Sequence, residues 1–136
     1  EDITDECEDP PASMWMVDIT DEQKPVIVSQ YSVPEGGKYS RCDGQKGKRF
    51  GTHQPHEAVA KDNLVYAACF AGGMRIIDIS DPYHPTEAGF YVPEPVESYR
   101  FPQTNDIFVD SRGLIYLIDR LNGFDIVRFS VPADSE

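Results

Sequence analysis

A short histidine-carboxylate segment has the clearest capacity for chemistry in this sequence. His53 and His56 are separated by two residues, and Glu57 follows directly. Imidazole and carboxylate groups bind divalent metals, and imidazole favours zinc, copper, iron or manganese. The spacing lets a loop turn both rings inward, and it differs from the helical H-E-x-x-H pattern. We treat His53 and His56 as candidate ligands of a divalent metal ion and Glu57 as a candidate catalytic acid or base.

The elements that carry these residues follow from an internal repeat. The stretch from His56 to Ser80 runs in step with the stretch from Asn105 to Ser130, with a one-residue adjustment near Leu64. Each copy has three apolar segments separated by one polar turn and one glycine-containing turn. This pattern predicts antiparallel strands joined by tight turns. The expected strands are 57–60, 64–70, 74–79 and 86–92 in one copy, 106–109, 114–120 and 124–129 in the next, and a partial earlier copy ending with 26–33.

Four-stranded antiparallel meanders repeated around an axis form a β-propeller. The sequence therefore predicts an all-β fold of β-propeller blades. The expected segments are an acidic N-terminal segment (1–13), a partial blade with strands 3 and 4 (14–35), an inter-blade loop (36–55), a complete blade (56–95), a three-stranded partial blade (96–131) and a tail (132–136). This is about two and a half blades, whereas a closed ring needs roughly four to eight. We expect a second chain to supply the remaining blades.

Blade geometry places the polar residues at one mouth of the central channel. The inner strand of each blade faces the channel, so His56-Glu57 and the equivalent Asn105-Asp106 would meet there. A structural alternative stays open, in which the histidines bond loop backbone and Asp106 caps a turn. Asp119 and Arg120 could form an ion pair between blades or in the channel. The candidate roles are catalytic for Glu57 and Asp106, metal-binding for His53 and His56, and ligand-binding for Gln54, Asn105 and Arg120.

The same segments resemble the LVIVD-repeat β-propeller family. The resemblance is carried by GGMRIIDISDP at 72–82, MVDITD at 16–21, the histidine segment at 49–57 and the last repeat from 103 to 120, and it covers about residues 14–131. It implies the C-terminal portion of a ring of about seven blades. The family is often exported and mostly without an assigned activity, so the resemblance implies an extracellular or periplasmic location and a partner carrying the other blades.

The composition of the chain limits the kinds of partner that it can bind. The net charge of −12 repels phosphate backbones, which argues against nucleic acid. No apolar run approaches the ~18 residues of a membrane span. Cys69 lies in an apolar strand and is expected to be a buried thiol, whereas Cys7 and Cys42 lie in polar sequence and could be oxidised.

Two functions fit these features. The first is a metal-dependent enzyme, a hydrolase, lyase or oxidase acting on a small molecule at the channel mouth. The second is a non-catalytic extracellular propeller scaffold that binds protein or glycan. The glycine-rich, locally basic segment 36–49 is a candidate functional loop or partner contact.

Overall fold

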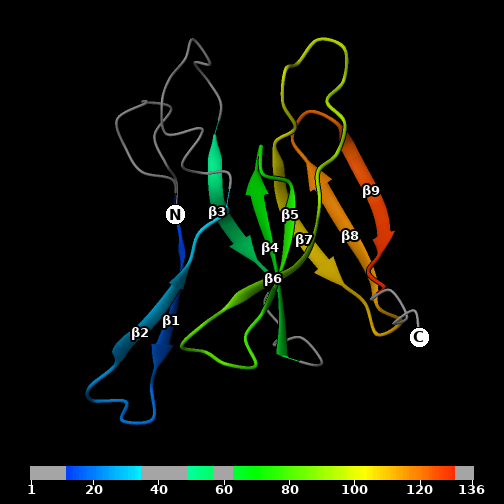
Figure 1. Cartoon of the computed structure of the whole chain (residues 1–136). Helices are drawn as coiled ribbons and strands as arrows, with labels where there is room; N and C mark the ends of the chain where they lie inside the picture. The colour runs from blue at the N-terminus through cyan, green and yellow to red at the C-terminus, as the bar shows by residue number, and fades with distance from the viewer. Residues whose placement is uncertain (1–11, 35–48, 57–62, 131–136) are drawn as a thin grey trace, which may run out of the picture.

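The computed structural model describes residues 12–34, 49–56 and 63–130, and these ranges contain nine β-strands (Figure 1). No helix among the described residues has the length and apolar character needed to cross a membrane. The strands are β1 (Met14–Asp18), β2 (Val26–Tyr31), β3 (Phe50–Pro55), β4 (Leu64–Phe70), β5 (Met74–Asp78), β6 (Thr86–Tyr91), β7 (Thr104–Val109), β8 (Leu114–Asp119) and β9 (Gly123–Arg128).

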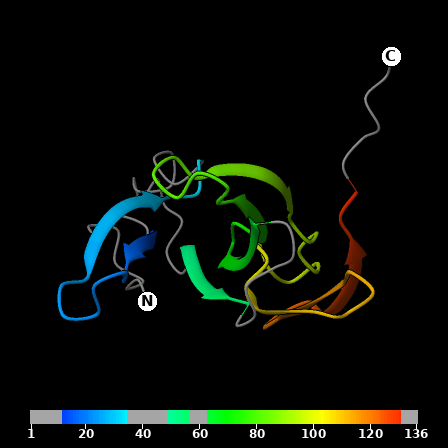
Figure 2. The ribbon, with the colours of Figure 1, turned by 90° about the horizontal axis from the view of Figure 1, so that it is seen from below.

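The strands form three consecutive antiparallel groups. β1 and β2 make a hairpin, β3 to β6 make a four-stranded meander, and β7 to β9 make a three-stranded meander. The last two groups are joined where Phe70, at the end of β4, pairs with Thr104 of β7. Figure 2 shows the three groups following one another across the molecule. The all-β prediction of β-propeller blades is confirmed.

The middle group contains a strand that the repeat did not predict, β3 (Phe50–Pro55), which pairs with β4. The expected strand 57–60 lies outside the described residues. β3 therefore occupies the end of the segment 36–55 that the sequence assigned to an inter-blade loop. Its first half is buried, and the N–H of His56 continues the pairing by donating to the Tyr66 carbonyl at 2.8 Å. Burial and backbone pairing explain why this short polar segment is extended.

The core consists of two clusters on opposite faces of the middle group. On one face, Tyr31 and Val33 from the first hairpin pack with residues such as Cys69 and Ile77. On the other, a second cluster joins the middle group to β7 and β8; its buried members are Ala68, Met74, Ile76, Ile107, Ile115 and Leu117. Because neighbouring sheets cover both faces, β4 reads as a nearly continuous apolar run and not as an alternation. The groups therefore stack face to face, as propeller blades do.

Candidate functional site

The two histidines of the predicted metal site contact different aromatic residues. The His53 ring stacks on Phe70 of β4, with centroids 4.2 Å apart and planes inclined by 26°. The His56 ring meets the edge of Phe108 of β7 at a centroid distance of 5.5 Å. The two imidazole rings thus pack against aromatic rings of two different strands, His53 against β4 and His56 against β7.

The predicted metal centre is not assembled by the part of the chain that the structure describes. Within 12–34, 49–56 and 63–130, no three His, Cys, Asp or Glu side chains are grouped so that they could hold a metal ion. Glu57, the candidate catalytic residue next to His56, lies outside these ranges. The metal role of the histidines and the catalytic role of Glu57 stay predictions from the sequence.

Asp106 and Gln54 occupy ordinary strand positions. The Asp106 side chain is exposed, and its Oδ1 accepts a hydrogen bond from the N–H of Ile107 at 2.8 Å. Gln54 is half-buried in β3 and pairs with Ala68 of β4. The Asp106 bond to nearby backbone resembles the structural alternative considered for this residue, although the backbone group belongs to a strand and not to a turn.

Two of the predicted site residues contact the Phe70 ring, and a third, Asn105, bonds one of them. His53 stacks on it, and the guanidinium carbon of Arg120 lies 5.5 Å from its centroid. Arg120 Nε also donates a hydrogen bond to Asn105 Oδ1 at 2.6 Å. Arg49, immediately before β3, places its guanidinium carbon 5.7 Å from the same centroid. We call these five residues the Phe70 cluster.

The backbone around Phe70 explains why so many segments converge there. Phe70 is buried, ends β4 and has a positive φ of 49°, a conformation that turns the chain sharply. The turn is closed by the Gly73 N–H, which donates to the Phe70 carbonyl at 3.0 Å. Phe70 also pairs with Phe50 of β3 and Thr104 of β7. Phe70 therefore links β4, to which it belongs, with β3 and β7.

Sequence reasoning missed Phe70 and Arg49 as site residues. One signal was present, because the repeat aligns Phe70 with Arg120: both lie at the end of the second strand of their blade, Phe70 as its last residue and Arg120 directly after it. Equivalent positions in adjacent blades lie at the same end of the stack, so these two residues could have been paired. Arg49 was seen only as part of a locally basic segment.

Asp119 does not pair with Arg120, contrary to the ion pair considered from the sequence. Its Oδ2 accepts from the Gln103 N–H at 2.7 Å, and its Oδ1 accepts from the N–H groups of Leu121 and Asn122 at 2.9 and 3.0 Å. The buried carboxylate thus binds backbone at the β8–β9 turn and shapes the loop that presents Arg120.

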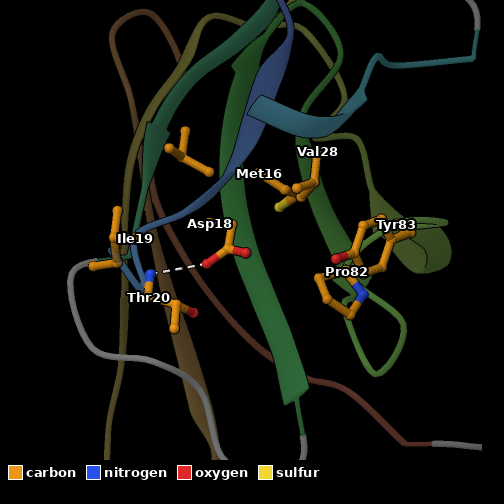
Figure 3. Close-up of a pocket in the computed structure, with 8 residues that line it drawn as sticks. Met16, Asp18, Ile19, Thr20, Val28, Pro82 and Tyr83 are labelled. Atoms are coloured by element: carbon orange, nitrogen blue, oxygen red, sulfur yellow. Dashed lines mark hydrogen bonds between the residues drawn. The ribbon is translucent and has the colours of Figure 1, made fainter. Parts of the chain in front are cut away.

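A groove of about 500 Å³ lies between the first hairpin and the β5–β6 turn (Figure 3). We call it the inter-blade groove; its lining residues are Met16, Val17, Asp18, Ile19, Thr20, Val28, Pro82 and Tyr83. Asp18 Oδ1 accepts a hydrogen bond from the Thr20 N–H at 2.8 Å. Bonding to Thr20 lowers the pKa of the Asp18 carboxyl, so this group is ionised at neutral pH. Sequence reasoning did not anticipate the groove, because its two walls come from different blades.

Stacked antiparallel meanders define the chain as a set of β-propeller blades. Residues 58–92 match the model of the LVIVD repeat. The chain therefore contains an LVIVD repeat, and the resemblance noted from the sequence is confirmed. No curated protein and no solved structure was found to match the chain.

Proposed function

We propose that the chain is a segment of a larger β-propeller that acts as a non-catalytic binding scaffold, with further blades covering both ends of its stack. The observation that carries this proposal is the contrast between equivalent positions in the middle and outer groups. Apolar side chains that are buried in the middle group are exposed in the outer groups.

The contrast is sharpest on the last group. Phe124 and Ile126 of β9 are 58% and 54% exposed, whereas the equivalent Met74 and Ile76 of β5 are 2% and 1% exposed. In β5 this face is covered by the group that follows it. Phe108 extends the exposed face of the last group. We call Phe108, Phe124 and Ile126 the trailing face, and we infer that one more blade covers it.

The first hairpin shows the same contrast on its opposite side. Val17 is 45% exposed, whereas its repeat equivalent Ile77 is fully buried against the preceding hairpin. Trp15, two residues earlier on the same strand, is also largely exposed. Contiguous exposed apolar patches usually mark interaction surfaces. A preceding blade would cover this leading face.

The covering blades are supplied, in this proposal, by a second chain, as the sequence predicted. The two faces of the middle group are not equivalent, because one packs against the first hairpin and the other against β7 and β8. A partner blade must therefore present the counterpart of the buried Ile107, Ile115 and Leu117 to the trailing face. Apolar sheet packing and not charge would hold the ring together.

Native mass spectrometry, applied to the protein from its natural source and to variants produced in the same way, tests whether further blades cover the stack. We expect a species larger than the 15.3 kDa chain, and we expect the double variant Phe124→Lys/Ile126→Lys to lose it. Val96→Lys is a matched control, because Val96 is exposed in the connection after β6. A folded 15.3 kDa monomer that binds no hydrophobic dye would contradict the proposal.

The inter-blade groove favours glycan as the ligand of the scaffold. Tyr83 is largely exposed at its rim, and the ionised Asp18 lies within it. A flat aromatic side chain with a nearby hydrogen-bond acceptor suits a sugar ring, which has apolar faces and hydroxyl donors. Oligosaccharide titration followed by NMR should show binding that Tyr83→Ala weakens and Tyr99→Ala does not. Equal effects of both variants would exclude the groove.

The metal-dependent enzyme stays the competing prediction. Elemental analysis of the purified natural material, followed by the same measurement on His56→Ala, tests it. Stoichiometric zinc, copper, iron or manganese that disappears in the variant would favour the enzyme over the scaffold. The extracellular or periplasmic location is likewise a prediction, and Cys7 and Cys42 lie outside the described residues.

A further inference from the structure

We infer that the Phe70 cluster is a binding site for a small oxyanion, a carboxylate or a phosphate. The site goes beyond the scaffold role and does not depend on further blades, because every residue in it belongs to this chain. Its members come from the segment before β3, from β3, from the end of β4, from β7 and from the β8–β9 turn.

Arg120 is the group that would contact the anion. Its Nε is held by Asn105 Oδ1 at 2.6 Å, and its guanidinium lies over the Phe70 ring. These two contacts fix the plane of the Arg120 guanidinium group. Within the described ranges, the terminal nitrogens of Arg120 donate no hydrogen bond and its guanidinium makes no ion pair. A guanidinium fork is suited to bidentate binding of carboxylate or phosphate oxygens.

The carboxylate next to Arg120 in the sequence is not available to it. Asp119 uses Oδ2 for the Gln103 N–H and Oδ1 for the N–H groups of Leu121 and Asn122. Asp119 is also buried, so it cannot turn toward Arg120 without breaking several hydrogen bonds. Arg120 is therefore an exposed cation without a carboxylate partner among the described residues, in a chain whose net charge is −12.

The rest of the cluster adds favourable electrostatics. Arg49 brings a second guanidinium to the Phe70 ring, and the His53 imidazole stacks on that ring. Each guanidinium group adds positive potential near the Phe70 ring, which favours an anion bound by Arg120. His53 and Asn105 supply further polar groups from the neighbouring strands. The cluster is locally basic against an acidic background, which would attract a small anion selectively.

Isothermal titration calorimetry at low ionic strength tests the site, with citrate and inorganic phosphate as separate probes and sodium chloride as the reference. We expect saturable binding of at least one oxyanion with a dissociation constant of millimolar or tighter. The preferred probe distinguishes a carboxylate ligand from a phosphate ligand. Absence of saturation by either probe would overturn the inference.

Substitution of Arg120 locates the binding. Arg120→Gln should weaken it about tenfold, whereas Arg128→Gln, which removes the same charge from β9, should leave it nearly unchanged. Arg120→Lys keeps the charge without the fork and should also bind more weakly, which provides a second test if Arg120→Gln is unfolded by circular dichroism. Equal weakening by the Arg120 and Arg128 variants would show only general charge attraction and would overturn the site.

Discussion

The hydroxyl of Tyr31 donates a hydrogen bond to the carboxylate of Glu87, and this bond joins the first hairpin to the middle group. The same oxygen of Glu87 accepts from Arg75 at 3.2 Å, and Arg75 is itself buried. Arg75 Nε donates to the Gly72 carbonyl at 2.8 Å. Burial, followed by the bond to Glu87, raises the pKa of the Tyr31 hydroxyl, so it remains a donor at neutral pH. A satisfied polar network thus fixes how two blades are aligned.

Removing this hydroxyl should destabilise the stack. Tyr31→Phe keeps the buried ring but withdraws one donor from the Glu87 carboxylate. A hydrogen bond to a charged group contributes about 1.5–3 kcal/mol, so we expect a loss of free energy of unfolding in that range. Urea denaturation followed by circular dichroism measures it.

Tyr99→Phe is the matched control for Tyr31→Phe, because Tyr99 is about half exposed and its hydroxyl makes no hydrogen bond to a described residue. It should change the free energy of unfolding by less than about 0.5 kcal/mol. Equal losses in the two variants would show that the bond between blades contributes nothing.

Two glycines with similar backbone angles should respond differently to alanine. Gly73 has φ +70° and Gly113 has φ +75°. A Cβ on Gly73 would lie 2.3 Å from the Tyr91 carbonyl oxygen, whereas a Cβ on Gly113 would meet nothing within 4 Å. Gly113→Ala should therefore cost only the left-handed backbone penalty of about 1–2 kcal/mol. Gly73→Ala should cost clearly more, because the β5–β6 pairing must shift.

Denaturant unfolding of both glycine variants, measured against the wild-type chain, gives the comparison. Because both variants carry the backbone penalty, the difference between their losses of free energy of unfolding reports the close approach of Tyr91 and Val92 to Gly73. Similar losses for the two would mean that the turn at Gly73 can relax without cost.

Cys69 should be inert toward thiol reagents while the protein is folded. It is fully buried, and burial raises the pKa of its thiol to about 12. The thiolate is the reactive form, so both its population and its access are low. In a Cys7→Ser/Cys42→Ser background, labelling by a disulfide reagent at pH 8 should require denaturant. Rapid labelling of the folded protein would show that the first core cluster opens.

The repeat predicted most of the strands closely, because their turns and their apolar pattern are both local. The segments 64–70 and 114–120 match β4 (Leu64–Phe70) and β8 (Leu114–Asp119), and the third strands agree as well. Turn residues such as Asn122-Gly123 fix where these strands end. Strands that are buried on both faces also carry enough β-branched and apolar residues to be recognised.

The site could be predicted only in part, because it depends on contacts between distant segments. His53, Asn105 and Arg120 were each named as candidate site residues, and their functional roles stay predictions. Phe70, which contacts His53 and Arg120, reads in sequence as an ordinary core residue. β3 was missed because Gly51, His53 and Gln54 give it a weak strand propensity. Pairing with β4 stabilises its extended conformation.

Asp110 should give the stability of the last group a dependence on acid pH. Desolvation would raise the pKa of its carboxyl, but hydrogen bonds from Arg112, Leu114 and Tyr116 outweigh it and lower the pKa to about 2. As pH falls from the ordinary value of 3.8 toward 2, the unfolded chain takes up this proton before the folded one does. The stabilisation is therefore present above about pH 4 and is lost as pH falls through the folded pKa.

Carbon-13 NMR of the carboxyl groups measures this titration directly, and we expect an Asp110 midpoint near pH 2. Asp110→Asn should remove its share of the decline in thermal midpoint between about pH 4 and pH 2. Arg112→Gln should move the Asp110 midpoint upward, because it removes the charged partner whose Nε lies 2.8 Å from Oδ2. Arg128→Gln is again the charge-matched control, since Arg128 bonds only the Arg112 carbonyl among the described residues. An Asp110 midpoint near 4 in the wild-type protein would show that the turn between β7 and β8 is not closed by this carboxylate.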